Sequence, residues 1–171
     1  GAGCAASQPP PPASPRPASR PDDSAKGSPG SPLDRFFSID MHTHPGPFYG
    51  RSGDVATRLE AFRSSKLTAI VYSVLSDLAV LDMTGPPRVT REPLPGELYA
   101  STVLQLNQAR EHLERSGIRL ALTPSDLVSA KERGEKAAVL AIEGADFADE
   151  DLGRLGNVYQ LGVRILQPIH Y

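Results

Sequence analysis

The chain has 171 residues, with 18 lysines and arginines against 20 aspartates and glutamates, which gives a formal net charge of −2. This near-balance argues against a nucleic-acid-binding protein, which needs a basic excess or a basic face. A single cysteine excludes a disulfide framework and any zinc site built from several thiolates. No apolar run approaches the ~20 residues that a membrane-spanning helix needs.

Residues 1–33 have the composition of a disordered linker rather than of a folded domain. They hold nine of the 17 prolines, and Leu33 is their only large apolar residue. Such a stretch cannot bury enough surface to offset its conformational entropy, and its prolines favour an extended tether. We therefore expect the folded domain to span residues 34–171.

Cys4 follows three small residues and precedes this linker, a context that resembles the end of a bacterial lipoprotein signal. In such a signal the cysteine is lipidated and becomes the new N-terminus. Gly1 stands where the signal usually has leucine, and the alternative is a cysteine without a role in a low-complexity tail. The lipoprotein interpretation predicts a lipid-anchored protein of the bacterial cell envelope.

After residue 34 the chain alternates between short apolar runs and amphipathic stretches. The apolar runs have the character of buried parallel strands, and we predict strands at 36–41, 67–75, 118–122, 137–142 and 163–169. Apolar residues at helical spacing predict helices at 51–65, 96–116, 125–133 and 149–161. Ser125 is the expected N-cap of the third helix, and three acidic residues fall in the first turn of the fourth.

Alternation of apolar strands with helices predicts an α/β fold with a parallel sheet. Four or five strands fit either an open sheet or half of a (β/α)8 barrel. The sequence stops at Tyr171, directly after a strand-like run. A whole barrel needs about 250 residues, so we expect a truncated chain that holds the N-terminal half of a (β/α)8 barrel at 34–171.

Two histidines follow the first predicted strand, in the stretch Asp40-Met-His-Thr-His-Pro-Gly46. Side chains two apart on a strand share a face, so His42 and His44 should project together from its carboxyl end. Parallel α/β folds place their active sites there. Two imidazoles at this spacing form half of a zinc site, and we favour metal binding over two exposed loop histidines without a role.

Two further strand ends carry groups suited to the same site. Glu143 follows an apolar strand, and a carboxylate there is costly to bury unless it is paired or bound to a metal; a solvent-facing carboxylate is the alternative. His170 ends the last predicted strand and should reach the same rim as a metal ligand, substrate donor or transition-state stabiliser. We interpret Asp146 as a cap of the next helix and His112 as part of a solvated helix face.

Three motifs in chain order resemble the membrane (renal) dipeptidase family, the microsomal zinc dipeptidases among the amidohydrolase-like barrels. They are Ile39-Asp-Met-His-Thr-His, Ile142-Glu-Gly and Leu161-Gly-Val-Arg-Ile-Leu-Gln-Pro-Ile-His-Tyr. The resemblance covers about residues 34–171. It implies a (β/α)8 barrel with two zinc ions at its mouth, and hydrolysis of the peptide bond of dipeptides by a metal-activated water.

The resemblance also implies roles for individual residues. His42 matches the first-strand histidine ligand, and Glu143 matches the carboxylate that bridges both zinc ions. His170 matches a catalytic, substrate-binding histidine that supports the tetrahedral intermediate and does not bind metal. The remaining ligands of the family, two histidines, and its later catalytic aspartate would lie beyond Tyr171, so we expect this fragment alone to be inactive.

One position departs from the family pattern. The best-known members have aspartate where this chain has His44, whereas His-x-His is the rule in the wider amidohydrolase group. We therefore expect His44 to bind metal, and an amidohydrolase acting on a cyclic amide, lactone or ester is an alternative function. A third hypothesis is a barrel-derived lipoprotein without catalysis. The expected partner is a dipeptide substrate, and we expect no nucleic-acid partner. We expect contact with a membrane only through lipidated Cys4. A homodimer is a candidate assembly.

Overall fold

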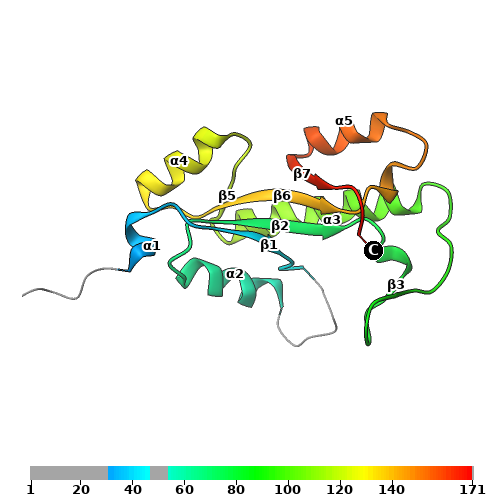
Figure 1. Ribbon diagram of the computed structural model, residues 1–171, viewed down its shortest axis with the longest axis horizontal. Coiled ribbons are helices and arrows are strands. Elements are labelled where there is room, and N and C mark those ends of the chain that lie inside the picture. Colours follow the sequence, from blue (N-terminus) through cyan, green and yellow to red (C-terminus); the bar gives the residue numbers. More distant parts are fainter. Residues whose placement is uncertain (1–30, 47–53, 171) are drawn as a thin grey trace, which may run out of the picture. The chain divides into compact units, whose positions relative to one another are not determined.

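The computed structural model describes residues 31–46 and 54–170, in which five parallel strands form the central sheet. The order is β1-β2-β6-β5, and β7 pairs with β6 along the same edge as β5 (Figure 1). The strands are β1 (Ile39–Thr43), β2 (Ala69–Leu75), β5 (Arg119–Leu120), β6 (Ala137–Glu143) and β7 (Val163–Gln167). All partners run parallel, as the fully apolar strands predict.

Helices follow the strands in alternation. They are α1 (Pro32–Arg35), α2 (Val55–Ser64), α3 (Glu97–Arg115), α4 (Pro124–Arg133) and α5 (Gly153–Gln160), with the 3-10 turns η1 (Leu78–Val80) and η2 (Asp146–Ala148). A two-stranded antiparallel hairpin, β3 (Leu81–Asp82) with β4 (Arg88–Val89), lies between η1 and α3. Among the described residues no helix is both long and apolar enough to cross a membrane.

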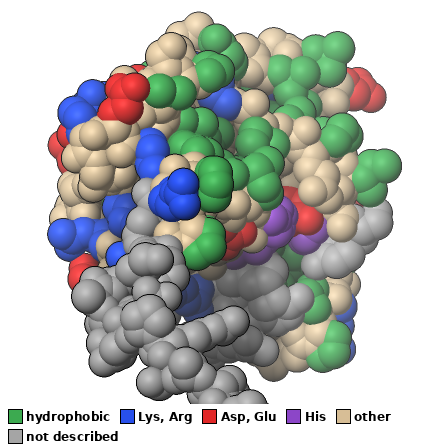
Figure 2. Space-filling view, turned by 60° about the vertical axis from the view of Figure 1, so that its left-hand side comes forward, with side chains coloured by type: hydrophobic (Ala, Val, Ile, Leu, Met, Phe, Trp, Pro, Cys, Tyr) green, Lys and Arg blue, Asp and Glu red, His purple; other side chains and the backbone are tan. Residues whose placement is uncertain are grey.

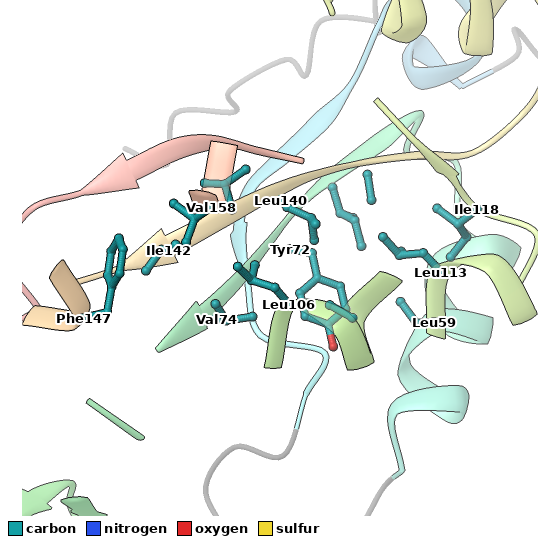
Figure 3. Packing of buried hydrophobic residues seen from close by; sticks show 14 of the residues in the cluster. Leu59, Tyr72, Val74, Leu106, Leu113, Ile118, Leu140, Ile142, Phe147 and Val158 are labelled. Atoms are coloured by element: carbon teal, nitrogen blue, oxygen red, sulfur yellow. The ribbon is translucent and has the colours of Figure 1, made fainter. Parts of the chain in front are cut away.

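The main core lies between one face of the sheet and the helices α2, α3 and α5. Side chains at alternate positions of β2 and β6, such as Tyr72 and Leu140, pack with Leu106 and Leu113 of α3 (Figure 3). The opposite face carries smaller residues and forms a second cluster with Ala130 of α4. This packing on both faces holds β2 and β6 firmly, and the carboxyl ends of these strands carry the candidate site.

The strand predictions at 67–75 and 137–142 are confirmed by β2 and β6, whose residues are almost all buried. The first strand begins at Ile39, three residues later than predicted, because the chain first forms helix α1. Ser31 accepts the Leu33 N–H and Pro32 occupies the first turn, both favourable at a helix start. Regular structure therefore begins inside the predicted linker, whose residues 1–30 lie outside the described residues.

Two helix starts differ from the prediction. Thr123, not Ser125, caps α4, because Thr123 and Asp126 form a reciprocal capping box. Helix α5 begins at Gly153, so the acidic residues predicted for its first turn precede it. Asp149 has a φ of 50°, outside the helical region, and its position separates η2 from α5.

Candidate metal centre

Three side chains from the ends of two strands converge at the carboxyl end of the sheet. The Nε2 atoms of His42 and His44 lie 2.9 Å apart, and each lies 3.3 Å from Oε2 of Glu143. In a tetrahedral zinc site, donor atoms bound at their usual distances lie roughly 3.3 Å from one another. The three donors therefore have the spacing of ligands to one metal ion. Figure 2 shows histidine side chains gathered beside an acidic one.

The end of β1 directs both histidines toward Glu143. The pairing of β1 with β2 shifts register between Asp40 and Thr43, and Asp40 Oδ1 accepts the His42 N–H at 3.1 Å. Such irregularities re-aim side chains beside functional sites. The two imidazoles consequently meet edge to face, with ring centres 4.7 Å apart.

A backbone contact sets the tautomer of His44. Its Nδ1 lies 3.1 Å from the carbonyl oxygen of Ser73 on β2. Because a carbonyl only accepts hydrogen bonds, Nδ1 carries the proton, and Nε2 presents its lone pair to the centre. Burial lowers the pKa of His44 below its usual value, and the neighbouring His42 lowers it further. The neutral imidazole that results is the form that binds metals.

Arg58 on α2 holds the loop that follows β1. Its Nη1 donates hydrogen bonds to the carbonyl oxygens of His44, Pro45 and Gly46, at 3.3, 3.4 and 2.7 Å. One half-buried guanidinium therefore contacts three successive carbonyl groups and fixes the path of the chain directly after His44.

Glu143 lies between the ends of two neighbouring strands. It pairs in register with Leu75 of β2 and Gln167 of β7. Gln167 Nε2 donates to Oε1 at 3.3 Å, while Oε2 faces the imidazoles. The side chain of Glu143 is only 13% exposed, and a carboxylate so buried needs a cationic partner. A bound metal supplies that charge, so the donor set fits a divalent ion such as zinc.

His170 lies at the same rim, three residues after β7. Its Nδ1 is 3.0 Å from both carboxylate oxygens of Asp77, and the side chains of His170 and Asp77 are 8% and 11% exposed. An ionised carboxylate only accepts, so Nδ1 carries a proton. His170 Nε2 then faces the centre, 3.9 Å from Glu143 Oε2.

Sequence reasoning missed Asp77, although it follows β2 closely, much as Glu143 ends β6. The rule that selected Glu143 as a polar group at a strand end would have found it. Arg58 and Gln167 gave no local signal, because their roles depend on strands and loops remote in sequence. The Cys4 prediction lies outside the described residues.

Two secondary interpretations need correction. His112 does not lie on a solvated face: it is half-buried, and its buried Nδ1 has no hydrogen-bond partner among the described residues. It lines a small cavity of about 30 Å³ together with His44 and Gln105. Asp146 does not cap α5; it starts η2, and its Oδ2 accepts a hydrogen bond from Ser76 Oγ at 3.3 Å.

Gly144 allows the chain to turn directly after the centre. Its φ is 91°, and an added Cβ would collide with Oγ of the fully buried Ser76.

Gly144→Ala should therefore lower the free energy of unfolding by roughly 2–4 kcal/mol, because backbone strain and overpacking act together. Urea unfolding measures this change. Gly85→Ala, with nothing near its added Cβ, should change stability by less than ~1 kcal/mol; equal effects of both substitutions would contradict the steric argument.

Several solved structures share this fold at low sequence identity. No protein-family model and no curated protein matches the chain. Among solved structures, an amidohydrolase from Pseudomonas aeruginosa aligns with a TM-score of 0.55 and 17% identity over 80% of this chain and 35% of that chain. The dipeptidase AC, a metallopeptidase of family M19, aligns with a TM-score of 0.56 and 16% identity over 78% of this chain and 42% of that chain. The probable dipeptidase PvdM from Pseudomonas aeruginosa aligns with a TM-score of 0.56 and 18% identity over 78% of this chain and 34% of that chain.

The fold is that of a partial (β/α)8 barrel. The predicted fold class and the likeness to amidohydrolases and dipeptidases are thereby confirmed at the level of the fold. The chain spans 34–42% of the length of these structures.

Proposed function

We propose that the protein containing this chain is a metal-dependent hydrolase that cleaves the peptide bond of dipeptides, with zinc as its metal. The observation that carries the proposal is the convergence of His42 Nε2, His44 Nε2 and Glu143 Oε2 within the reach of one ion. The likeness in fold to structures described as metallopeptidase and amidohydrolase supports it. The described residues supply ligands for one ion, and the second ion rests on the motif resemblance.

Each group has a defined task in this proposal. His42, His44 and Glu143 would hold the metal, which when bound supplies a hydroxide from water and polarises the scissile carbonyl. His170 holds a proton on Nδ1 against Asp77. When its Nε2 is also protonated, His170 donates a hydrogen bond to the oxygen that gains charge as the carbonyl is attacked, and Asp77 stabilises the imidazolium.

A second candidate is hydrolysis of a cyclic amide, lactone or ester. His44 favours it, since the His-x-His pattern belongs to the wider amidohydrolase group, and one structure that this fold resembles is described as an amidohydrolase. Both candidates use the same centre, so only the substrate separates them.

The deciding experiment loads the full-length protein with zinc and compares turnover of dipeptides with turnover of lactones. Metal content is measured in parallel. We expect tight zinc binding and turnover of dipeptides in preference to lactones. A zinc-loaded protein that hydrolyses lactones alone would support the second candidate, and a protein that binds no zinc would contradict both.

We further propose that lipidated Cys4 anchors the protein in the bacterial cell envelope, on the basis of its sequence context. Cys4→Ser should move the full-length protein from the membrane fraction to the soluble fraction, because a lipid chain is the sole membrane contact in this proposal. Fractionation followed by immunoblotting measures the change. An unchanged membrane fraction would contradict the anchor.

A further inference from the structure

A pocket of about 690 Å³ opens beside the candidate metal centre. Its wall is formed by the segments that follow β2, β4, β6 and β7, together with the start of α3. Figure 1 shows the ends of β2, β6 and β7 at the same end of the sheet. His170 lines the pocket and also lies 3.9 Å from Glu143. The volume falls in the range of about 300–1,000 Å³ that small-molecule sites occupy.

The charged groups of this pocket are strongly one-sided. Of the described residues that line it, four carry carboxylates and none is a lysine or arginine. Two of these carboxylates have cationic or hydrogen-bonding partners. Asp149 lies 2.8 Å from Nη1 of Arg154, and Asp77 holds the His170 ring at 3.0 Å. The Arg154 guanidinium offsets the charge of Asp149, and the carboxylate oxygens of Asp77 are occupied by the His170 ring.

The other two carboxylates are those of Glu92 and Asp146. Both are exposed, and no ion pair joins either of them to a lysine or arginine among the residues that the structure describes. Within the described part of the chain, the Asp146 carboxylate accepts one hydrogen bond, from the neutral hydroxyl of Ser76. The pocket therefore presents two carboxylates that a cation would neutralise.

The remaining lining is largely apolar. Val80 and Leu98 are 4% and 6% exposed and form a buried part of the wall, whereas Val89 and Ile169 are 59% and 69% exposed. A ligand that covers exposed valine and isoleucine side chains removes apolar surface from water, and this burial stabilises the complex. The pocket thus combines apolar walls with acidic groups, and it suits a ligand with an apolar stem and a cationic head.

We propose that this pocket binds a lysine- or arginine-like side chain of the substrate, so that the hydrolase prefers dipeptides with one cationic residue. The aliphatic stem would lie against Leu98 and Ile169, and the cationic head would lie near Glu92 and Asp146. His170 belongs to both the centre and the pocket wall, so a residue whose peptide bond reaches the centre can extend its side chain into the pocket. This inference rests on the proposed function and names its substrate class.

The test uses the full-length protein and matched dipeptides. Norleucine has the straight aliphatic stem of lysine without the ammonium group, so alanyl-lysine and lysyl-alanine are each compared with their norleucine and glutamate counterparts. Calorimetric titration of metal-depleted protein measures binding without turnover, and kcat/KM is measured on zinc-loaded protein. For one of the two residue orders we expect the lysine peptide to exceed its norleucine counterpart by about fivefold in affinity and in kcat/KM, the combined effect of two partly exposed ion pairs. The glutamate peptide should have the lowest affinity and kcat/KM, and the preference for lysine should shrink in high salt.

The double variant Glu92→Gln and Asp146→Asn should abolish the lysine preference, so that the lysine and norleucine peptides bind and are hydrolysed alike. Glu132→Gln on α4 removes the same kind of charge from an exposed position outside the pocket, and it should keep the preference. A preference that survives in the double variant, or that Glu132→Gln removes equally, would overturn the assignment of the pocket.

Failure of this inference can be told apart from failure of the proposed function. Zinc-dependent hydrolysis of dipeptides with no preference for lysine in either order would overturn the pocket assignment alone. Tighter binding of lysine peptides that depends on Glu92 and Asp146, without zinc-dependent turnover of any dipeptide, would overturn the proposed function and retain the binding site.

Discussion

Glu143→Gln is expected to lower the affinity for zinc by at least ~100-fold, because loss of a group that merely supports a ligand already costs about 10–100-fold. Glu143 Oε2 is the atom that both imidazoles face at 3.3 Å, so the substitution removes the only anion among the three donors. Without that charge, two neutral imidazoles must hold a divalent cation in a half-buried site. Turnover should fall together with metal content.

Competition against a chelator of known zinc affinity measures this loss. Glu111→Gln serves as the control, since Glu111 is an exposed carboxylate of α3 that pairs with Arg115 and lies outside the centre. It should leave zinc affinity unchanged. His42→Ala should resemble Glu143→Gln, because it removes a second donor. Full zinc affinity in Glu143→Gln would show that the metal binds elsewhere.

His170→Ala should retain zinc and lower kcat by about 10²–10³, the usual effect of removing one donor to a developing oxyanion. The His170 ring is held by Asp77 through Nδ1, and its Nε2 is 3.9 Å from Glu143, farther than either imidazole of the proposed ligand set. It is therefore placed to contact a substrate bound at the centre rather than to bind the metal itself.

Zinc content and steady-state kinetics of the full-length variant test this role together. Asp77→Asn is the informative companion, because the amide can still occupy the space beside Nδ1 but has no charge to stabilise the imidazolium. It should reduce kcat by less than His170→Ala and leave zinc content unchanged. Loss of the metal in His170→Ala would make His170 a ligand and contradict its proposed role.

The sequence was informative where a property depends on neighbouring residues. Continuous apolar runs predicted β2 and β6 within two residues, since a strand buried on both faces needs apolar side chains at every position. Helix starts were less predictable, because Thr123 and Ser125 are both good caps and only the backbone conformation decides between them. The β3–β4 hairpin was missed, since two-residue strands are too short for any periodic pattern.

For the candidate site, the sequence by itself determined the chemical groups and their places at strand ends. His42, His44, Glu143 and His170 follow from residue type and strand position alone. Tertiary structure decided their partners: Asp77 meets His170 across 93 residues of chain. Such pairs form only because parallel register brings the carboxyl ends of distant strands to one edge of the sheet. The acidic pocket has the same origin, since its wall is assembled from segments that no local pattern connects.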